Sequence, residues 1–86
     1  MMSTQPFRLE DLMDILEDKA GLPASDRTAD ASLTFTEIGL DSLAFLALQA
    51  TLESRYGFEL QDESLQNATF REIVDAVNER LEKVKA

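Results

Sequence analysis

The chain has 86 residues, with 8 basic and 17 acidic side chains, a formal net charge of −9, and neither cysteine nor histidine. A chain of this length forms one small domain with a thin core. The two missing residue types exclude disulfides, cysteine nucleophiles, Ser-His-Asp triads, and thiolate or imidazole metal sites. The acidity excludes a non-specific nucleic-acid binder and favours partners with basic surfaces. No signal-peptide pattern or membrane-length apolar run occurs, so we expect a cytoplasmic protein that makes no membrane contact.

The N-terminal part of the chain predicts a flexible lead over residues 1–7 and then a helix over about residues 8–20. Apolar residues recur along one face of that helix, at Leu9, Leu12, Met13, Leu16 and Ala20. Gly21, followed by Leu22-Pro23, is a typical stop signal. We assign residues 8–86 to a single domain.

Residues 21–40 form a long connection with no sustained apolar period. A connection of this length inside a small domain is unusual, and it is often functional or packed against the core. We expect its apolar residues to attach it to the core: Leu33, Phe35, Ile38 and Leu40. Residues 36–39 have the composition of a helical turn that ends at Gly39.

The second half of the chain predicts the remaining helices. Asp41 is a good N-cap for a helix over residues 42–56, which has no breaker before Gly57. A short helix is expected around residues 62–65. Thr69 and Glu72 fit a capping box, and a single apolar stripe follows over residues 70–84. No segment alternates with period two, so the predicted fold is all-α: three main helices, one short helix, and a long loop between the first two.

The helix predicted over residues 42–56 has two apolar faces. At 100° per residue, one face contains Phe45, Leu48, Leu52 and Tyr56, and the opposite face contains Leu43, Leu46, Ala47 and Ala50. Either the long loop covers the second face, or that face is a docking surface for another protein. The interval between Arg27 and Arg55 contains acidic residues but no other basic ones, which adds support to docking.

The predicted core joins the first face of this helix to the stripes of the other two. We expect nine side chains to be buried together: Leu12, Leu16, Phe45, Leu48, Leu52, Tyr56, Ile73, Val77 and Leu81.

Ser42 is the candidate for a chemical role. As the first residue of a helix it is most simply explained as part of the cap. It has no histidine to activate it as a nucleophile, but another enzyme could attach a group to its hydroxyl. A phosphodiester at this position would be stabilised by the free N–H groups and the dipole of the helix N-terminus.

The segment from Glu37 to Ala44 reads Glu-Ile-Gly-Leu-Asp-Ser-Leu-Ala, and it resembles the phosphopantetheine attachment motif of acyl carrier proteins. The resemblance covers about residues 8–84, including the first helix, the long loop and the last helix. The ending of the central helix, from Leu52 to Gly57, is especially similar to free-standing carriers of type II polyketide synthases.

The resemblance implies a carrier and not an enzyme. Ser42 would carry 4′-phosphopantetheine, transferred from coenzyme A by a separate phosphopantetheinyl transferase, with Gly39, Asp41 and Leu43 supporting the motif. The polyketide chain would be held as a thioester and moved among a ketosynthase with its chain-length factor, a malonyl transferase and tailoring enzymes. We expect a monomer with no metal site.

The central helix departs from fatty-acid carriers, which have several acidic residues along it. The corresponding face here has Ala44, Ala47, Gln49 and Ala50, with Glu53 alone acidic. This favours a polyketide system and an apolar docking face that comprises Leu43, Leu46, Ala47, Ala50 and Glu53. Two alternatives stay open: a carrier of fatty-acid or other acyl or aminoacyl biosynthesis, and a non-carrier acidic helical protein that binds a basic partner.

Overall fold

The computed structural model describes residues 7–60 and 63–85, and within them the chain is helical. Three α-helices form the body of the molecule: α1 (Leu9–Lys19), α2 (Ser42–Tyr56) and α3 (Phe70–Lys85). Three short 3₁₀ helices lie in the connections: η1 (Ala24–Asp26), η2 (Thr36–Ile38) and η3 (Glu63–Asn67). The described residues contain no strand beyond one isolated bridge between Thr34 and Thr69. The all-α prediction is therefore confirmed.

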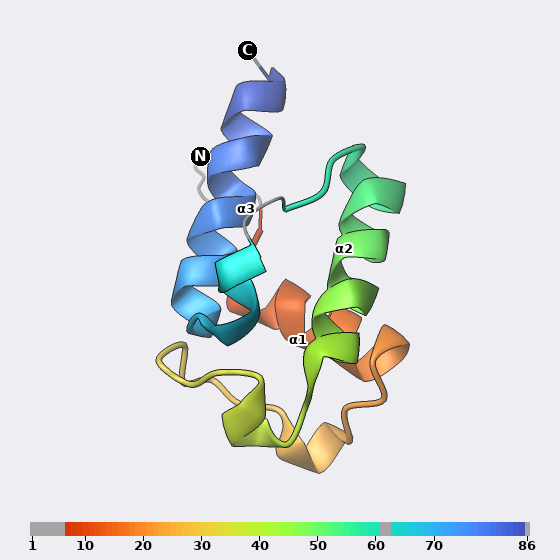
Figure 1. The fold of residues 1–86 in the computed structure, drawn as a ribbon, viewed down its shortest axis with the longest axis vertical. Helices are drawn as coiled ribbons and strands as arrows, with labels where there is room; N and C mark the ends of the chain where they lie inside the picture. The colour runs from red at the N-terminus through yellow and green to blue at the C-terminus, as the bar shows by residue number, and fades with distance from the viewer. Residues whose placement is uncertain (1–6, 61–62, 86) are drawn as a thin grey trace.

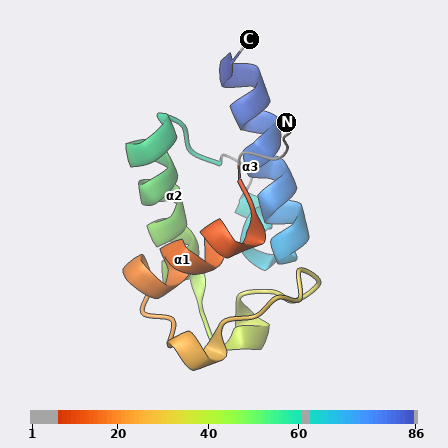
Figure 2. The ribbon, with the colours of Figure 1, turned by 180° about the vertical axis from the view of Figure 1, so that it is seen from behind.

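The arrangement of the helices is a small bundle in which α1 crosses the other two. Helices α2 and α3 extend along the long axis of the molecule, and α1 lies across both of them (Figure 1, Figure 2). The long loop that carries η1 and η2 closes the end of the bundle at which α2 begins (Figure 1). The start of α2 therefore lies at an end of the molecule and is reached directly from this loop.

Local sequence signals set the helix boundaries. Helix α2 has the predicted bounds, and both α1 and α3 agree with the prediction to within one residue at each end. At the start of α3, the Thr69 hydroxyl accepts from the Glu72 N–H at 3.3 Å, and the Glu72 carboxylate accepts from the Thr69 N–H at 3.1 Å. The predicted capping box is therefore present. The short helix expected around residues 62–65 is η3, and position 62 lies outside the described residues.

The core contains eight of the nine side chains predicted to be buried. The exception is Tyr56, which is only partly buried and packs against the rim of the core. Its ring contacts two phenylalanines, with centroids 6.4 Å from Phe7 and 6.1 Å from Phe58. The core also contains residues that helical periodicity did not select, among them Phe7, Ile15, Leu22, Phe58 and Leu60.

Phe7 corrects the predicted boundary of the N-terminal lead. Its side chain is fully buried, so it belongs to the packed domain and not to a flexible segment. The Phe7 N–H donates to the Asn78 side-chain oxygen at 2.9 Å, and the Asn78 amide donates back to the Phe7 carbonyl at 2.9 Å. The two bonds join the entrance of α1 to the middle of α3. Residues 1–6 of the expected lead lie outside the described residues.

The long loop is packed down at its C-terminal half, as predicted. Phe35 is buried between two aromatic rings, with centroids 6.2 Å from Phe45 and 5.5 Å from Phe70. Leu33, Ile38 and Leu40 are partly buried against the same core. Loop carbonyls also accept from the first backbone N–H groups of α3, with Phe70 bonded to Leu33 at 2.9 Å and Arg71 bonded to Ala31 at 2.8 Å. The segment before α2 is thus fixed by both side chains and backbone.

Ion pairs attach the other half of the loop to α1. The Arg27 guanidinium lies 2.8 Å from Asp14 and 2.8 Å from Glu17. The hydrogen bond to Glu17, followed by that to Asp14, raises the pKa of Arg27, so this cation stays charged. Hydrogen bonds from the Ser32 hydroxyl and N–H lower the pKa of Asp30 at the tip of the loop.

Candidate functional site

Ser42 lies at the exposed end of the bundle, as the first residue of α2. Its neighbours Asp41 and Leu43 are also exposed, whereas Ala44 is buried with only 2% of its surface accessible. The hydroxyl of Ser42 is therefore presented to solvent on a helix whose next turn is held in the core. This placement suits a residue that another protein must reach.

A left-handed turn directs the chain into α2. Gly39 has φ of 86°, a conformation that a residue with a side chain rarely adopts, and it ends η2. Its N–H donates to the Thr36 carbonyl at 3.0 Å, and the Leu40 N–H donates to the Phe35 carbonyl at 2.8 Å. With Ile38 and Leu40 partly buried, the approach to Ser42 is fixed on both sides of Gly39.

Asp41 caps α2, as the sequence predicts. Its backbone is extended, and its carboxylate accepts from the Leu43 N–H at 3.0 Å. The Asp41 carbonyl accepts from the Ala44 N–H at 3.0 Å and begins the helical hydrogen-bond ladder. The cap therefore fixes the first turn of α2 without using the Ser42 side chain.

The second apolar face of α2 is exposed. Leu43 and Leu46 have 68% and 54% of their surfaces accessible, Ala50 and Glu53 are exposed, and Ala47 is half-buried. The interpretation in which the long loop covers this face is wrong, because that loop packs below the start of α2 and against α3 (Figure 1). We call the surface formed by Leu43, Leu46, Ala47, Ala50 and Glu53 the outer face of α2.

Two residues that the sequence comparison with fatty-acid carriers placed on this face lie elsewhere. Ala44 is buried in the core. Gln49 is half-buried, and its amide donates to the Leu60 carbonyl, so it holds the segment that follows α2. The outer face keeps the five residues predicted for docking, and Ala44 and Gln49 do not belong to it.

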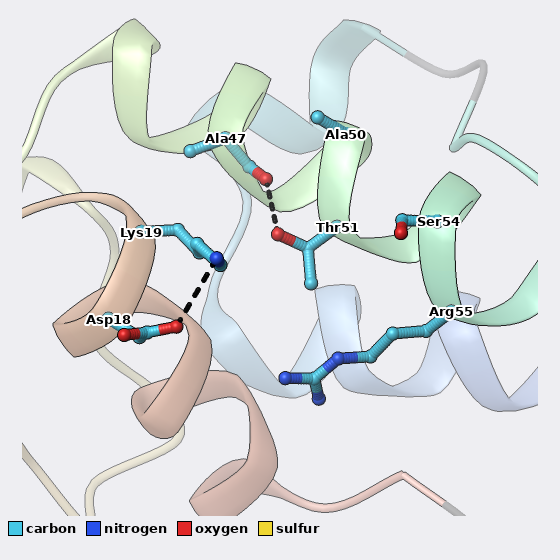
Figure 3. A pocket seen from close by; sticks show the side chains of 7 residues that line it. All are labelled: Asp18, Lys19, Ala47, Ala50, Thr51, Ser54 and Arg55. Carbon is cyan, nitrogen blue, oxygen red and sulfur yellow. Dashed lines mark hydrogen bonds and ion pairs between the residues drawn. The ribbon is translucent and has the colours of Figure 1, made fainter.

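A groove that the sequence did not predict separates α1 from the outer face. Its volume is about 510 Å³, and Figure 3 shows that α1 supplies one side and α2 the other. It is lined by Asp18, Lys19, Ala47, Ala50, Thr51, Ser54 and Arg55. A second hollow of about 470 Å³ lies beside the attachment motif and shares Lys19 with the groove. No sequence signal shows which end of α1 approaches α2, so these two hollows depend on the tertiary structure.

Other kinds of site are absent from the part of the chain that the structure describes. Residues 7–60 and 63–85 contain no group of three or more acidic side chains arranged to hold a metal ion. Within the same residues, no helix combines the length and apolar character that crossing a membrane requires.

Comparison with known proteins identifies the family. The family model described as a phosphopantetheine attachment site matches residues 10–77. The monensin polyketide synthase acyl carrier protein of Streptomyces virginiae is 43% identical over 82 residues, which cover 93% of each chain. The actinorhodin polyketide synthase acyl carrier protein of Streptomyces coelicolor is 39% identical, covering 80% of this chain and 84% of that protein. The anthracycline acyl carrier protein DpsG of Streptomyces peucetius is 37% identical, with coverages of 85% and 89%.

No solved structure gives a significant match. The family match spans most of the domain and includes the whole turn, cap and first helical turn around Ser42. The chain belongs to the acyl carrier proteins, whose domain contains the attachment site for phosphopantetheine.

Proposed function

We propose that this chain is the carrier of a type II polyketide synthase and that Ser42 is the residue that receives 4′-phosphopantetheine. The observation that carries the proposal is the exposed Ser42 hydroxyl at the start of a helix whose cap does not use it. The similar proteins named for the monensin, actinorhodin and anthracycline pathways support the polyketide assignment. Membership of the carrier family removes the alternative of an unrelated acidic interaction protein.

The residues around Ser42 fit the group. A phosphodiester on the hydroxyl would lie at the N-terminus of α2, where the helix dipole favours an anion. The Asp41 carboxylate is engaged by the Leu43 N–H and is thereby held within the cap. When attached, phosphopantetheine supplies the thiol on which an acyl chain is held as a thioester.

The chain's own residues present the Ser42 hydroxyl to the transferase and fix its orientation. Ala44, Phe45 and Leu48 hold α2 in the core, while Asp41 fixes its first turn, so Ser42 has a defined position. The Asp41 carboxylate beside Ser42 accepts from the Leu43 N–H, so we propose that the transferase accepts the serine proton when the phosphate ester forms. We propose a ketosynthase with its chain-length factor, a malonyl transferase and tailoring enzymes as further partners, and a cytoplasmic location for the assembly.

Intact-mass measurement tests the attachment site. The chain is incubated with coenzyme A, magnesium and a phosphopantetheinyl transferase, and a gain of one phosphopantetheine is expected. Ser42→Ala should abolish the gain completely while circular dichroism stays unchanged, because Asp41 still caps the helix. Ser54→Ala is the matched control, since Ser54 is an exposed serine on the same helix. Loading of a folded Ser42→Ala variant would show that the site is elsewhere.

Reconstitution with different synthases separates the polyketide carrier from a carrier of fatty-acid or other acyl biosynthesis. The loaded chain is supplied to a type II polyketide ketosynthase with its chain-length factor, and in parallel to a fatty-acid ketosynthase. Because the outer face of α2 is apolar and has Glu53 as its acidic residue, we expect elongation with the polyketide enzymes and poor elongation with the others. The reverse preference would support the alternative.

A further inference from the structure

The groove between α1 and α2 combines small side chains with a charged rim, which has the cations Lys19 and Arg55 and the carboxylate of Asp18. Ala47 and Ala50 form the floor together with Thr51, whose hydroxyl donates to the Ala47 carbonyl at 2.9 Å and is thereby satisfied within the helix. Figure 3 shows the Arg55 side chain extending from α2 toward α1, and Lys19 on α1 with its ammonium group joined to Asp18. An apolar group could therefore enter the groove without leaving the Thr51 hydroxyl unpaired.

Of the two cations at the groove, Arg55 is the one available to a partner. Among the described residues, no carboxylate forms an ion pair with Arg55, and Lys19 makes only an exposed pair with Asp18 at 3.5 Å. This differs from Arg27, which two carboxylates of α1 bind at 2.8 Å each. An exposed guanidinium presents a planar set of donors that matches a carboxylate, so the rim is suited to an acidic side chain.

The accessible side of α2 has different charged groups at its two ends. Its N-terminal end has the Asp41 carboxylate beside Ser42, and the exposed side chains of Leu43 and Leu46 follow. Near the C-terminal end of the helix is Arg55, which at 1.5 Å per residue lies about 20 Å along the helix from Ser42. A partner that matched this order would place a basic group near Ser42 and an acidic one at the far end.

We propose that the groove receives an apolar side chain of the ketosynthase that is flanked by a carboxylate, and that Arg55 pairs with this carboxylate. The inference rests on the proposed carrier function and adds the chemistry of the partner surface. The pairing fixes which way the partner lies along α2, because the reversed orientation would set the partner's carboxylate against Asp41 and its basic group against Arg55. Arg55 is thus a specificity-determining residue that orients the complex.

The test uses the sign of a charge effect. The chain is strongly acidic, so general attraction to a basic partner predicts that a further negative charge strengthens association or leaves it unchanged. Pairing at the groove predicts that a negative charge at position 55 weakens association. Arg55→Glu should raise the KM of the ketosynthase for the malonyl-loaded carrier about fivefold or more, with kcat retained, since charge groups in a contact of this kind affect binding. Arg55→Gln should give a smaller increase.

Arg71→Glu is the matched control. It makes the same change of charge at an exposed position near the other end of α1, where Arg71 lines a separate hollow with Leu9. The KM of the ketosynthase for the loaded Arg71→Glu carrier should be equal to or below its KM for the loaded carrier without a substitution. Circular dichroism and phosphopantetheine loading are measured for each variant to establish that the carrier is folded and functional.

The outcomes separate the two proposals. Failure of the unmodified chain to accept phosphopantetheine would overturn the proposed function itself. If loading is normal and Arg55→Glu leaves KM unchanged or lowers it, the carrier function stands and the carboxylate pairing is wrong. An equal rise of KM in Arg55→Glu and Arg71→Glu would also overturn the pairing, because the effect would then follow total charge and not the groove.

Discussion

The two faces of α2 have similar compositions and opposite environments. The inner face places Phe45, Leu48 and Leu52 in the core with at most 1% of their surfaces accessible. The outer face leaves Leu43 and Leu46 more than half accessible, one helical turn or less from buried neighbours. Amino-acid type therefore does not distinguish a stabilising leucine from a recognition leucine in this helix. The distinction comes from α1 and the loop, which pack against one side of α2 only.

The largest expected effect is the loss of a leucine from the inner face. Leu52→Ala should lower the free energy of unfolding by about 2–5 kcal/mol, because it removes buried methyl groups and leaves a cavity. Denaturant titration measures the loss. Leu46→Ala is the matched control: it makes the same change on the outer face, where no cavity forms, and should stay within about 0.5 kcal/mol.

Equal losses in Leu52→Ala and Leu46→Ala would contradict the assignment of the two faces. It would mean that the outer face is covered by part of the chain in solution.

The next effect concerns a buried polar contact behind the inner face. Asn78 makes two hydrogen bonds to the backbone of Phe7, and both residues are buried. Asn78→Ala leaves the Phe7 N–H and carbonyl without partners, which should cost about 1–3 kcal/mol. Glu79→Ala, at the next and exposed position of α3, is the control for helix propensity. A loss no greater than that of the control would show that Phe7 is not held by this contact in solution.

A smaller effect is expected at the junction of the two faces, where Asp41 caps α2. Asp41→Ala removes the acceptor of the Leu43 N–H and should cost about 1 kcal/mol in thermal or denaturant unfolding. Asp41→Asn keeps an acceptor oxygen and should recover most of this stability. The alanine variant should also be loaded more slowly by the transferase, since the first turn around Ser42 loosens. Unchanged stability in Asp41→Ala would show that the cap contributes nothing.

Local signals in the sequence predicted most of the fold. The Asp41 cap, the Thr69 capping box and the glycines after each segment depend on residues a few positions apart, and the structure confirms the helices they delimit. The position of Ser42 on the first turn of α2 follows from the same signals. These features could be predicted because their hydrogen bonds close within three residues of sequence.

The features that were missed depend on long-range packing. Phe7 is buried because Asn78, at the other end of the chain, binds its backbone. The groove exists because the end of α1, with Lys19, lies beside small residues of α2 and near Arg55. The comparison with fatty-acid carriers placed Ala44 on the outer face, and only the position of the surrounding elements shows that it is buried. Periodicity establishes that α2 has two apolar faces but not how wide each one is.

The smallest effect on stability is expected for Leu46→Glu, the substitution that most directly tests recognition by the outer face. Leu46→Glu should unfold within about 0.5 kcal/mol of the unmodified chain, because the side chain is already exposed. It should accept phosphopantetheine normally and yet transfer chains poorly with the ketosynthase. An apolar anchor at an interface is typically worth about 1 kcal/mol or more, and burying an unpaired carboxylate adds a further cost. Ala29→Glu, which adds the same charge at an exposed position of the loop, is the control. Normal chain transfer in a folded Leu46→Glu variant would show that partners approach another surface, and the outer leucines would then need a different explanation.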